Sequence, residues 1–239
     1  MDKVNVLGVK VGKYSIDSAA DRIVQYLKDG ERRKSVFTPN SEIIMMGYKD
    51  PEFCKLLNRA DILTADGIGV VYASRILKNP IETRAAGYDI ACEVLAKMAP
   101  LGMSVYLFGA KPENICKKYP GVVIAGCADG YFDSDKEKLI IADINEKKPD
   151  VLFVCLGAPK QEKWIDAHKG ELDVGVCMGI GGRLDVFAGT AKRAPDFFVK
   201  FGIEWLYRLL KEPKRAGRMT VLPKFGLTVI LNGRKFKQE

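Results

Sequence analysis

The chain has 239 residues, 47% of them hydrophobic, with 38 lysines and arginines against 30 aspartates and glutamates. This composition excludes a disordered protein, and we expect neither a membrane-spanning helix nor a signal peptide, because charged residues interrupt the apolar runs. The whole net charge of +8 lies in residues 190–239, which hold 12 basic and 4 acidic residues. This asymmetry favours a polyanion or an anionic lipid surface as the partner of the C-terminal segment.

Six short apolar runs predict β-strands, and helical patterns lie between them. The runs cover residues 36–38, 62–65, 104–108, 122–125, 151–156 and 174–178. The helical patterns cover residues 17–28, with Ser15 or Asp17 as the N-cap, and residues 88–98, 112–118 and 134–146. Alternating strands and helices predict an α/β fold, in which helices cover both faces of a mostly parallel sheet.

The cysteines and the histidine offer no metal or triad chemistry. The cysteines lack paired metal-ligand spacing, and we interpret them as small core residues in a reducing compartment. His168 is the only histidine, and we interpret it as an exposed residue at a helix end. The six cysteines are Cys54, Cys92, Cys116, Cys127, Cys155 and Cys177.

In sheets of this kind, ligands bind outside the carboxyl ends of the strands. Five turns follow the predicted strands, and three of them are rich in glycine and lead into helices, where backbone N–H groups favour phosphate. Leu184 and Tyr72 stand where a dinucleotide fingerprint requires its third glycine, and no Walker lysine motif occurs, so a nicotinamide enzyme or P-loop ATPase is disfavoured. The turns cover residues 38–42, 65–69, 109–112, 157–162 and 179–183.

Polar side chains in these turns suit sugar chemistry, although each also has a structural explanation. Asp66 ends a strand before a glycine, which makes it the candidate general base or an N-cap. Thr38 and Asn40 suit sugar hydroxyls, or belong to a proline turn with Asn40 as the cap. Gln161, followed by Glu162, could reach a bound sugar or simply begin a surface helix.

Asp133 and Asp135 form an Asp-x-Asp pattern, which in some sugar transferases holds a divalent cation. A helical pattern follows directly, so a capping turn explains both aspartates, and we expect no metal site and no other cofactor.

The C-terminal segment combines an apolar stripe with basic residues. The stripe is typical of a buried helix, but the accumulated charge favours a membrane interface. A second apolar stretch, residues 221–231, contains Pro223 and precedes further basic residues. We therefore predict a catalytic domain, residues 1–194, and a basic amphipathic appendage, residues 195–239. The stripe consists of Phe197, Phe198, Phe201, Trp205, Leu206, Leu209 and Leu210.

Together these motifs resemble the WecG/TagA/CpsF family of bacterial glycosyltransferases, along essentially the whole chain. The resemblance implies a Rossmann-like body and a C-terminal helical appendage that meets the membrane. The motifs that carry it are Thr38-Pro39-Asn40-Ser41-Glu42, Ala65-Asp66-Gly67, Arg84 with Gly87-Tyr88-Asp89, Gly130-Tyr131-Phe132, Gly157-Ala158-Pro159-Lys160-Gln161-Glu162, Gly181-Gly182 to Ala188-Gly189, and Arg193-Ala194-Pro195 leading to Glu204-Trp205-Leu206-Tyr207-Arg208.

Within the family, the chain is most similar to transferases that build the linkage unit of wall teichoic acid. The resemblance implies transfer of N-acetylmannosamine from UDP-ManNAc to the 4-hydroxyl of GlcNAc on undecaprenyl-diphosphate-GlcNAc, with inversion and no required metal. It also implies a cytoplasmic protein bound peripherally to the inner face of the cell membrane. Asp66 would be the catalytic base, assisted by Thr38 and Gln161. The substrate-binding candidates are Asn40, Arg84, Gly109, Gly157, Gly181, Gly182, Arg208, Arg215 and Arg218.

Two other functions remain open at this stage. A sibling transferase would use another UDP-sugar, such as UDP-ManNAcA or UDP-glucose, on a polyprenyl-linked acceptor. A non-catalytic nucleotide-binding module would instead bind nucleic acid through its basic tail. The tail's aromatic residues follow a helical stripe and no RNA-binding signature occurs, so we expect no nucleic-acid partner. The oligomeric state is open, including a homo-oligomer.

Overall fold

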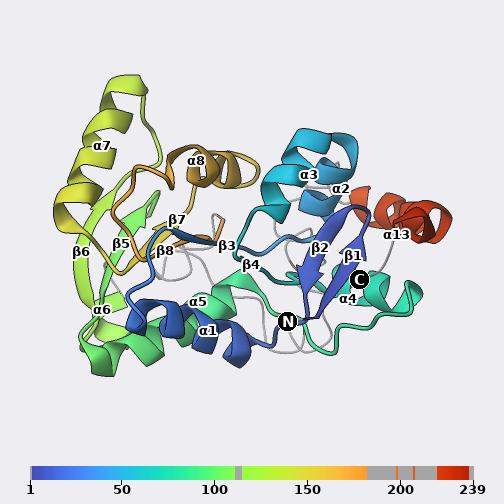
Figure 1. The fold of residues 1–239 in the computed structure, drawn as a ribbon, viewed down its shortest axis with the longest axis horizontal. Coiled ribbons are helices and arrows are strands. Elements are labelled where there is room, and N and C mark those ends of the chain that lie inside the picture. The colour runs from blue at the N-terminus through green and yellow to red at the C-terminus, as the bar shows by residue number, and fades with distance from the viewer. Residues whose placement is uncertain (1, 111–114, 182–197, 199–206, 208–219, 237–239) are drawn as a thin grey trace.

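The computed structural model describes residues 2–110, 115–181, 198, 207 and 220–236, and its centre is a parallel β-sheet (Figure 1). Six strands pair in the order β4-β3-β8-β7-β5-β6, each parallel to its neighbours. Every predicted apolar run overlaps one of these strands, so the predicted α/β class is confirmed. The strands are β3 (Lys34–Phe37), β4 (Ile62–Leu63), β5 (Ser104–Phe108), β6 (Val123–Ala128), β7 (Val151–Val154) and β8 (Val176–Gly179).

Helices cover both faces of the sheet, because successive side chains of each buried strand point to opposite faces. Val105 and Leu107 of β5 belong to one hydrophobic core, and Tyr106 and Phe108 belong to the other. The first core includes residues of α1 (Ile16–Lys28), α5 (Gly87–Met98) and α6 (Ile115–Lys118). The second includes residues of α2 (Ser41–Lys49), α3 (Pro51–Asn58), α4 (Ile68–Ile76), α7 (Ser134–Lys147), α8 (Lys160–His168) and α13 (Val221–Asn232).

An antiparallel hairpin, not predicted from the sequence, precedes the sheet. It consists of β1 (Lys3–Val6) and β2 (Val9–Gly12), and it packs against α2, α3 and α4. Its four valines, at positions 4, 6, 9 and 11, are fully buried. Leu7 and Gly8 form the turn with φ angles of 54° and 97°, as a two-residue hairpin turn requires.

Several local interpretations are settled by the side-chain contacts. Ser15, not Asp17, caps α1, because its hydroxyl accepts a hydrogen bond from the Ser18 N–H. His168 does end α8, but its imidazole is half-buried beside Glu171 and the Trp164 ring, so its interpretation as exposed is wrong. Among the cysteines, Cys155 and Cys177 are buried as expected, and the core interpretation is wrong for the exposed Cys127.

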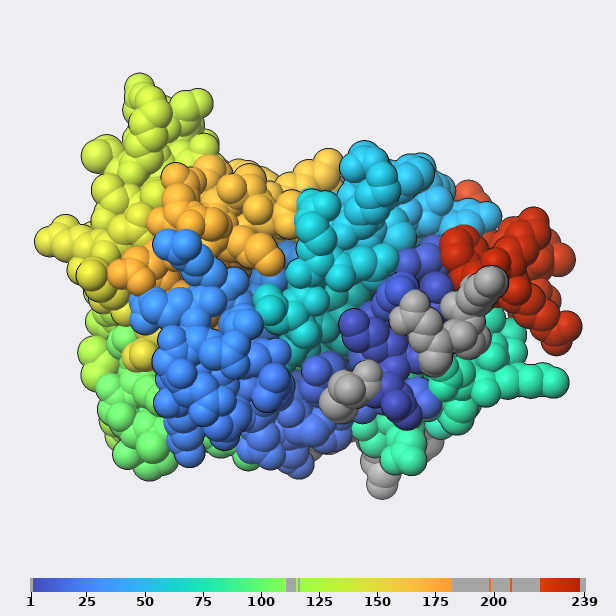
Figure 2. Space-filling view, viewed as in Figure 1, coloured from blue at the N-terminus to red at the C-terminus, as the bar shows by residue number. Residues whose placement is uncertain are grey.

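The C-terminal helix α13 packs against α2 and α4 of the body (Figure 2). Phe225 and Val229 point inward and are buried, whereas Leu227, Ile230 and Leu231 are exposed. Pro223 is tolerated in this helix because it lies in the first turn, where its missing N–H has no intrahelical partner to lose. In the described part of the chain, no helix is long and apolar enough to cross a membrane.

Most of the predicted apolar stripe, and the boundary at residues 194 and 195, lie outside the described residues. Phe198 and Tyr207 are described, and their ring centroids are 5.2 Å apart in a tilted contact.

Candidate active site

The predicted ligand turns lie along one edge of the sheet, because all six strands are parallel and their carboxyl ends meet there. Along this carboxyl edge, Asp66 follows β4, Thr38 follows β3, Gly181 follows β8, Gly157 follows β7 and Gly109 follows β5. Neighbouring strands in a sheet are about 4.8 Å apart. Asp66 and Thr38 therefore lie on adjacent strands at one end, and Gly109 lies four strands away from Asp66.

Asp66 is buried, with 8% of its surface exposed, at the start of the turn that leads into α4. Its N–H donates to the Pro39 carbonyl, 3.1 Å away, which joins the turns after β3 and β4. The N-cap of α4 is Gly67, whose φ of 108° suits glycine, so the interpretation of Asp66 as the N-cap is wrong. Asp66 therefore lies at the carboxyl edge but does not serve as an N-cap.

Arg84 enters the site through a segment that runs beside the turn after β4. The Ala85 N–H donates to the Ala65 carbonyl at 3.0 Å, and the Thr64 hydroxyl donates to the Ala85 carbonyl at 3.0 Å. Arg84 Nη2 lies 3.5 Å from Asp89 Oδ2 at the beginning of α5. The structure thus places the backbone of the Arg84 segment beside the turn that carries Asp66, and pairs the mostly buried Arg84 guanidinium with Asp89.

Thr38 and Asn40 occupy the same edge, but their side chains have structural contacts. Asn40 Oδ1 accepts hydrogen bonds from the N–H groups of Glu42 and Ile43 at 2.9 and 3.0 Å, so the capping interpretation is confirmed. Thr38 is buried against Gly87, where an added Cβ would lie 2.6 Å from the Thr38 hydroxyl oxygen. Only a glycine at position 87 lets α5 begin this close to β3.

Gln161 and Glu162 are both buried at the start of α8, with 4% and 1% of their surface exposed. Their interpretation as a surface helix start is therefore wrong. Gln161 Oε1 accepts from the Gly181 N–H at 2.8 Å, and Gln161 Nε2 donates to Glu162 Oε1 at 2.8 Å. Among the described residues, Glu162 Oε2 has no hydrogen-bond partner. Burial raises the pKa of the Glu162 carboxyl, against the hydrogen bond from Gln161, which lowers it.

The helices that begin at the carboxyl edge differ in how their first N–H groups are used. Asn40 caps α2, whereas within the described part of the chain no side chain caps α4, α5 or α8. Uncapped helix N-termini carry partial positive charge and N–H donors, which favour anions. Three helices therefore present this chemistry to the same edge.

The Asp-x-Asp pattern has a structural role in this chain. Asp133 caps α7 by accepting from the Lys136 N–H at 2.9 Å, which confirms the capping interpretation of this residue. Asp135 is exposed and pairs with Lys138 at 3.2 Å. Across the described ranges, no three His, Cys, Asp or Glu side chains gather closely enough to hold a metal ion.

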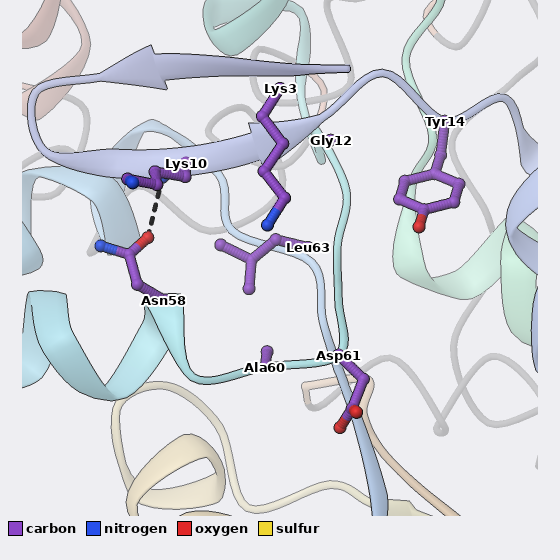
Figure 3. A pocket seen from close by; sticks show the side chains of 8 residues that line it. All are labelled: Lys3, Lys10, Gly12, Tyr14, Asn58, Ala60, Asp61 and Leu63. Carbon is purple, nitrogen blue, oxygen red and sulfur yellow. Dashed lines mark hydrogen bonds between the residues drawn. The ribbon is translucent and has the colours of Figure 1, made fainter. Parts of the chain in front are cut away.

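A small pocket of about 20 Å³ lies elsewhere, between the hairpin and the start of β4 (Figure 3). Lys3, Tyr14 and Asp61 surround it, and Asp61 precedes β4 at the amino end of the strand. This volume suffices for a water molecule. It is therefore neither placed nor sized to be the site at the carboxyl edge.

Four of the predicted binding residues, Gly182, Arg208, Arg215 and Arg218, lie outside the described residues. Sequence reasoning recognised Gln161 but gave Glu162 no role of its own. The only sequence signal for Glu162 was its position, two residues after Lys160 in a helix that follows a glycine turn. This position does not reveal that the Glu162 side chain is buried.

Comparison with known proteins identifies the family of this chain. Residues 4–239 match the model of the glycosyl transferase WecG/TagA/CpsF family. A protein of Bacillus spizizenii named N-acetylglucosaminyldiphosphoundecaprenol N-acetyl-beta-D-mannosaminyltransferase is 36% identical over 92% of this chain and 89% of its own length. Identically named proteins of Bacillus subtilis and Staphylococcus aureus are each 35% identical, over 90% and 99% of this chain and 86% and 95% of their own lengths. The chain therefore belongs to the WecG/TagA/CpsF family of glycosyl transferases.

Proposed function

We propose that this protein transfers N-acetylmannosamine from UDP-ManNAc to the 4-hydroxyl of GlcNAc on undecaprenyl-diphosphate-GlcNAc, with inversion. This reaction would build the linkage unit of wall teichoic acid. The observation that carries the proposal is the buried Asp66 at the carboxyl edge, in a chain 35–36% identical to transferases named for this sugar and this acceptor.

In the proposed mechanism, the Asp66 carboxylate accepts the proton of the GlcNAc 4-hydroxyl as that oxygen attacks the anomeric carbon of ManNAc. The new bond joins the 4-oxygen to the anomeric carbon, while the bond from that carbon to the diphosphate oxygen breaks. UDP leaves with the electron pair of the broken bond. A single displacement of this kind inverts the anomeric configuration, and a positioned base typically accelerates such a step by about 10²–10⁴-fold.

The departing diphosphate needs positive charge and N–H donors. Arg84 and the uncapped N-termini of α4, α5 and α8 support this role, as do the turns at Gly157 and Gly181. Loss of one such donor typically costs about 3 kcal/mol of transition-state stabilisation. In the orientation we propose, the sugar lies at the Asp66 end, the diphosphate near Gly181 and Gly157, and the uridine toward Gly109. Thr38 and Gln161 would then flank the sugar and the diphosphate.

We propose that the protein reaches its lipid-linked acceptor by binding peripherally to an anionic membrane surface. The exposed face of α13 combines Leu227, Ile230 and Leu231 with the exposed cation Lys224, and the exposed Arg234 follows directly after the helix. An apolar helix face flanked by cations is suited to the headgroup boundary of a bilayer. The inward residue Phe225 also packs near Gly69 of α4, so a bound α13 would hold the Asp66 turn near the lipid.

The transfer reaction is tested by offering UDP-ManNAc, UDP-GlcNAc, UDP-glucose and UDP-ManNAcA with a short-chain lipid-diphosphate-GlcNAc acceptor in EDTA. A ManNAc-bearing lipid product from UDP-ManNAc alone is the expected result. Product from UDP-glucose or UDP-ManNAcA instead would identify a sibling transferase. No product from any donor would contradict a transferase of this class.

Membrane binding is tested by replacing Ile230 and Leu231 with glutamate and measuring sedimentation with vesicles that contain phosphatidylglycerol. We expect affinity for the vesicles to fall about tenfold, because apolar contacts are replaced by negative charges. Leu139 on α7 is the matched control, since it is 70% exposed and Leu231 is 66% exposed. A Leu139→Glu variant that loses as much affinity would refute α13 as the membrane-binding face.

A further inference from the structure

The side chain of Gln161 joins two turns of the carboxyl edge. Gln161 belongs to α8, which follows the Gly157 turn after β7, while its Oε1 accepts from the N–H of Gly181 in the turn after β8. Its Nε2 donates to Glu162 Oε1 at 2.8 Å. The chain from Glu162 through Gln161 to Gly181 therefore links the Gly157 turn to the Gly181 turn through buried side chains.

The hydrogen bonds that join Glu162, Gln161 and Gly181 allow only one orientation of the Gln161 amide. A backbone N–H can only donate, so the Gly181 N–H requires the oxygen of the amide to face it. The nitrogen of the amide then faces position 162, where an acceptor is needed. A rotated amide would place its N–H groups against the Gly181 N–H and leave two donors without an acceptor. The Gly181 N–H and the Glu162 carboxyl therefore determine together which way the Gln161 amide points.

Gly179 of β8 provides the space that this orientation needs. A Cβ at position 179 would lie 2.9 Å from Gln161 Nε2 and 3.2 Å from Gln161 Cδ. The first distance is shorter than a Cβ contact allows, so any side chain at position 179 would displace the end of Gln161. A strand glycine and a buried carboxyl therefore act on the same amide group.

Burial of the Glu162 carboxyl reduces the stability of the folded protein. Only 1% of its surface is exposed, and its Oε2 has no hydrogen-bond partner among the described residues. Buried polar atoms normally have partners, and those that lack one reduce stability. Residues that break this rule are concentrated at functional sites, and Glu162 lies beside two turns of the candidate site.

We propose that Glu162 is a positioning residue, which holds Gln161 and the Gly181 turn in the geometry that binds the diphosphate of a nucleoside diphosphate sugar. This inference rests on the proposed function, because that function makes Gln161 and Gly181 part of the donor site. Glu162 touches neither the donor nor the reacting atoms in this scheme. Its contribution passes entirely through the Gln161 amide.

The test compares three variants, each alone and combined with Gln161→Ala. Glu162→Met removes the acceptor and keeps the volume, Glu162→Gln keeps an acceptor oxygen, and Gly179→Ala places a methyl group against Gln161. The dissociation constant for UDP is measured by calorimetry, together with the KM for the donor and kcat in the transfer assay. Thermal unfolding verifies that each variant is folded.

We expect Glu162→Met and Gly179→Ala to weaken UDP binding and raise the donor KM by about tenfold, with a smaller change in kcat. Glu162→Gln should keep the dissociation constant for UDP within about threefold of the wild-type value, because its amide oxygen can still accept from Gln161. In the Gln161→Ala background, neither Glu162→Met nor Gly179→Ala should cause a further loss, since both act through the same side chain.

Three results would overturn this role of Glu162: wild-type UDP affinity in Glu162→Met, losses that add to that of Gln161→Ala, or equal losses in Glu162→Gln and Glu162→Met. If Glu162→Met does not fold, Glu162→Leu takes its place in the same comparison, and Gly179→Ala alone and in the Gln161→Ala background tests whether the Gln161 amide carries the effect. Wild-type protein that binds UDP but transfers no sugar would contradict the proposed transfer alone, and the UDP measurements would still judge Glu162. Wild-type protein that does not bind UDP would overturn both.

Discussion

At the amino edge of the sheet, Asp61 and Asp150 each accept two hydrogen bonds from a serine near the start of a strand. Asp61 Oδ2 accepts from the N–H and hydroxyl of Ser35, and Asp150 Oδ2 accepts from those of Ser104. At the carboxyl edge, by contrast, Glu162 keeps one oxygen without a partner among the described residues. The acids of the amino edge hold neighbouring strands together, whereas the carboxyl edge keeps a buried carboxyl beside the turns of the candidate site.

The largest effect that would separate the two edges is expected from Asp66→Asn. This variant keeps the shape of the side chain but removes the basic carboxylate, so the rate of transfer should fall by about 10²–10⁴-fold. The dissociation constant for UDP should stay within about threefold of the wild-type value, measured by calorimetry. Turnover equal to that of the wild type would eliminate Asp66 as the base.

At the amino edge, Asp150→Ala should reduce stability and leave the chemistry intact. Its carboxylate accepts hydrogen bonds of 2.7 and 2.8 Å from Ser104, and their loss should cost about 2 kcal/mol of the free energy of unfolding. For a chain of this size, the melting temperature should fall by roughly 4–8 °C. Asp150→Asn is the matched variant, since it keeps one acceptor oxygen. An increased UDP dissociation constant in folded Asp150→Ala would erase the contrast between the edges.

Glu162→Gln should give a smaller, pH-dependent gain in stability. Burial raises the pKa of Glu162, so the folded protein holds its proton more tightly than the unfolded chain does. The wild-type protein therefore loses stability as pH rises from the ordinary glutamate pKa toward the raised one. The variant has no such proton, so its melting temperature should equal that of the wild type near pH 4 and exceed it at pH 7.5. A gain of roughly 2–4 °C corresponds to about 1 kcal/mol. Equal melting temperatures at both pH values would contradict the burial cost.

Asp135→Ala should have the smallest effect. Asp135 and its partner Lys138 are both exposed, and such pairs contribute little to stability. We expect a melting temperature within about 1 °C of the wild type. Transfer activity should be unaltered in the presence or absence of EDTA. If the variant lost much of its transfer activity and excess divalent cation restored that activity, the result would support metal binding by the Asp-x-Asp pattern.

Most of the sheet could be predicted because β4, β5, β7 and β8 are buried on both faces and appear as apolar runs, whereas the edge strand β6 is more exposed. The hairpin was missed although its valines alternate, since Leu7-Gly8 is not a typical turn pair and the charged Lys3 and Lys10 interrupt the apolar pattern. The order β4-β3-β8-β7-β5-β6 has no counterpart in the sequence, because local patterns do not reveal which strands are neighbours.

The carboxyl-edge turns were predictable because ligands bind at the carboxyl ends of parallel strands. The hydrogen bonds that the side chains of these turns make were not predictable. Asn40 could cap a helix or bind a sugar through the same oxygen, and only the structure shows that it caps α2. The burial of Glu162 depends on contacts between α8 and the sheet, which no periodicity encodes. Family resemblance supplied the expected reaction, and the structure added which residues support one another.

We expect the carboxyl edge of the sheet, and not the amino edge, to bind the nucleotide. Titrating isotope-labelled protein with UDP and following the backbone amide resonances tests it directly. We predict that the largest shifts arise at Gly109, Gly157 and Gly181, while Ser35 and Ser104 remain unperturbed. Shifts concentrated at Ser35, Ser104 or the pocket around Lys3 and Asp61, with none at the glycine turns, would contradict the claim.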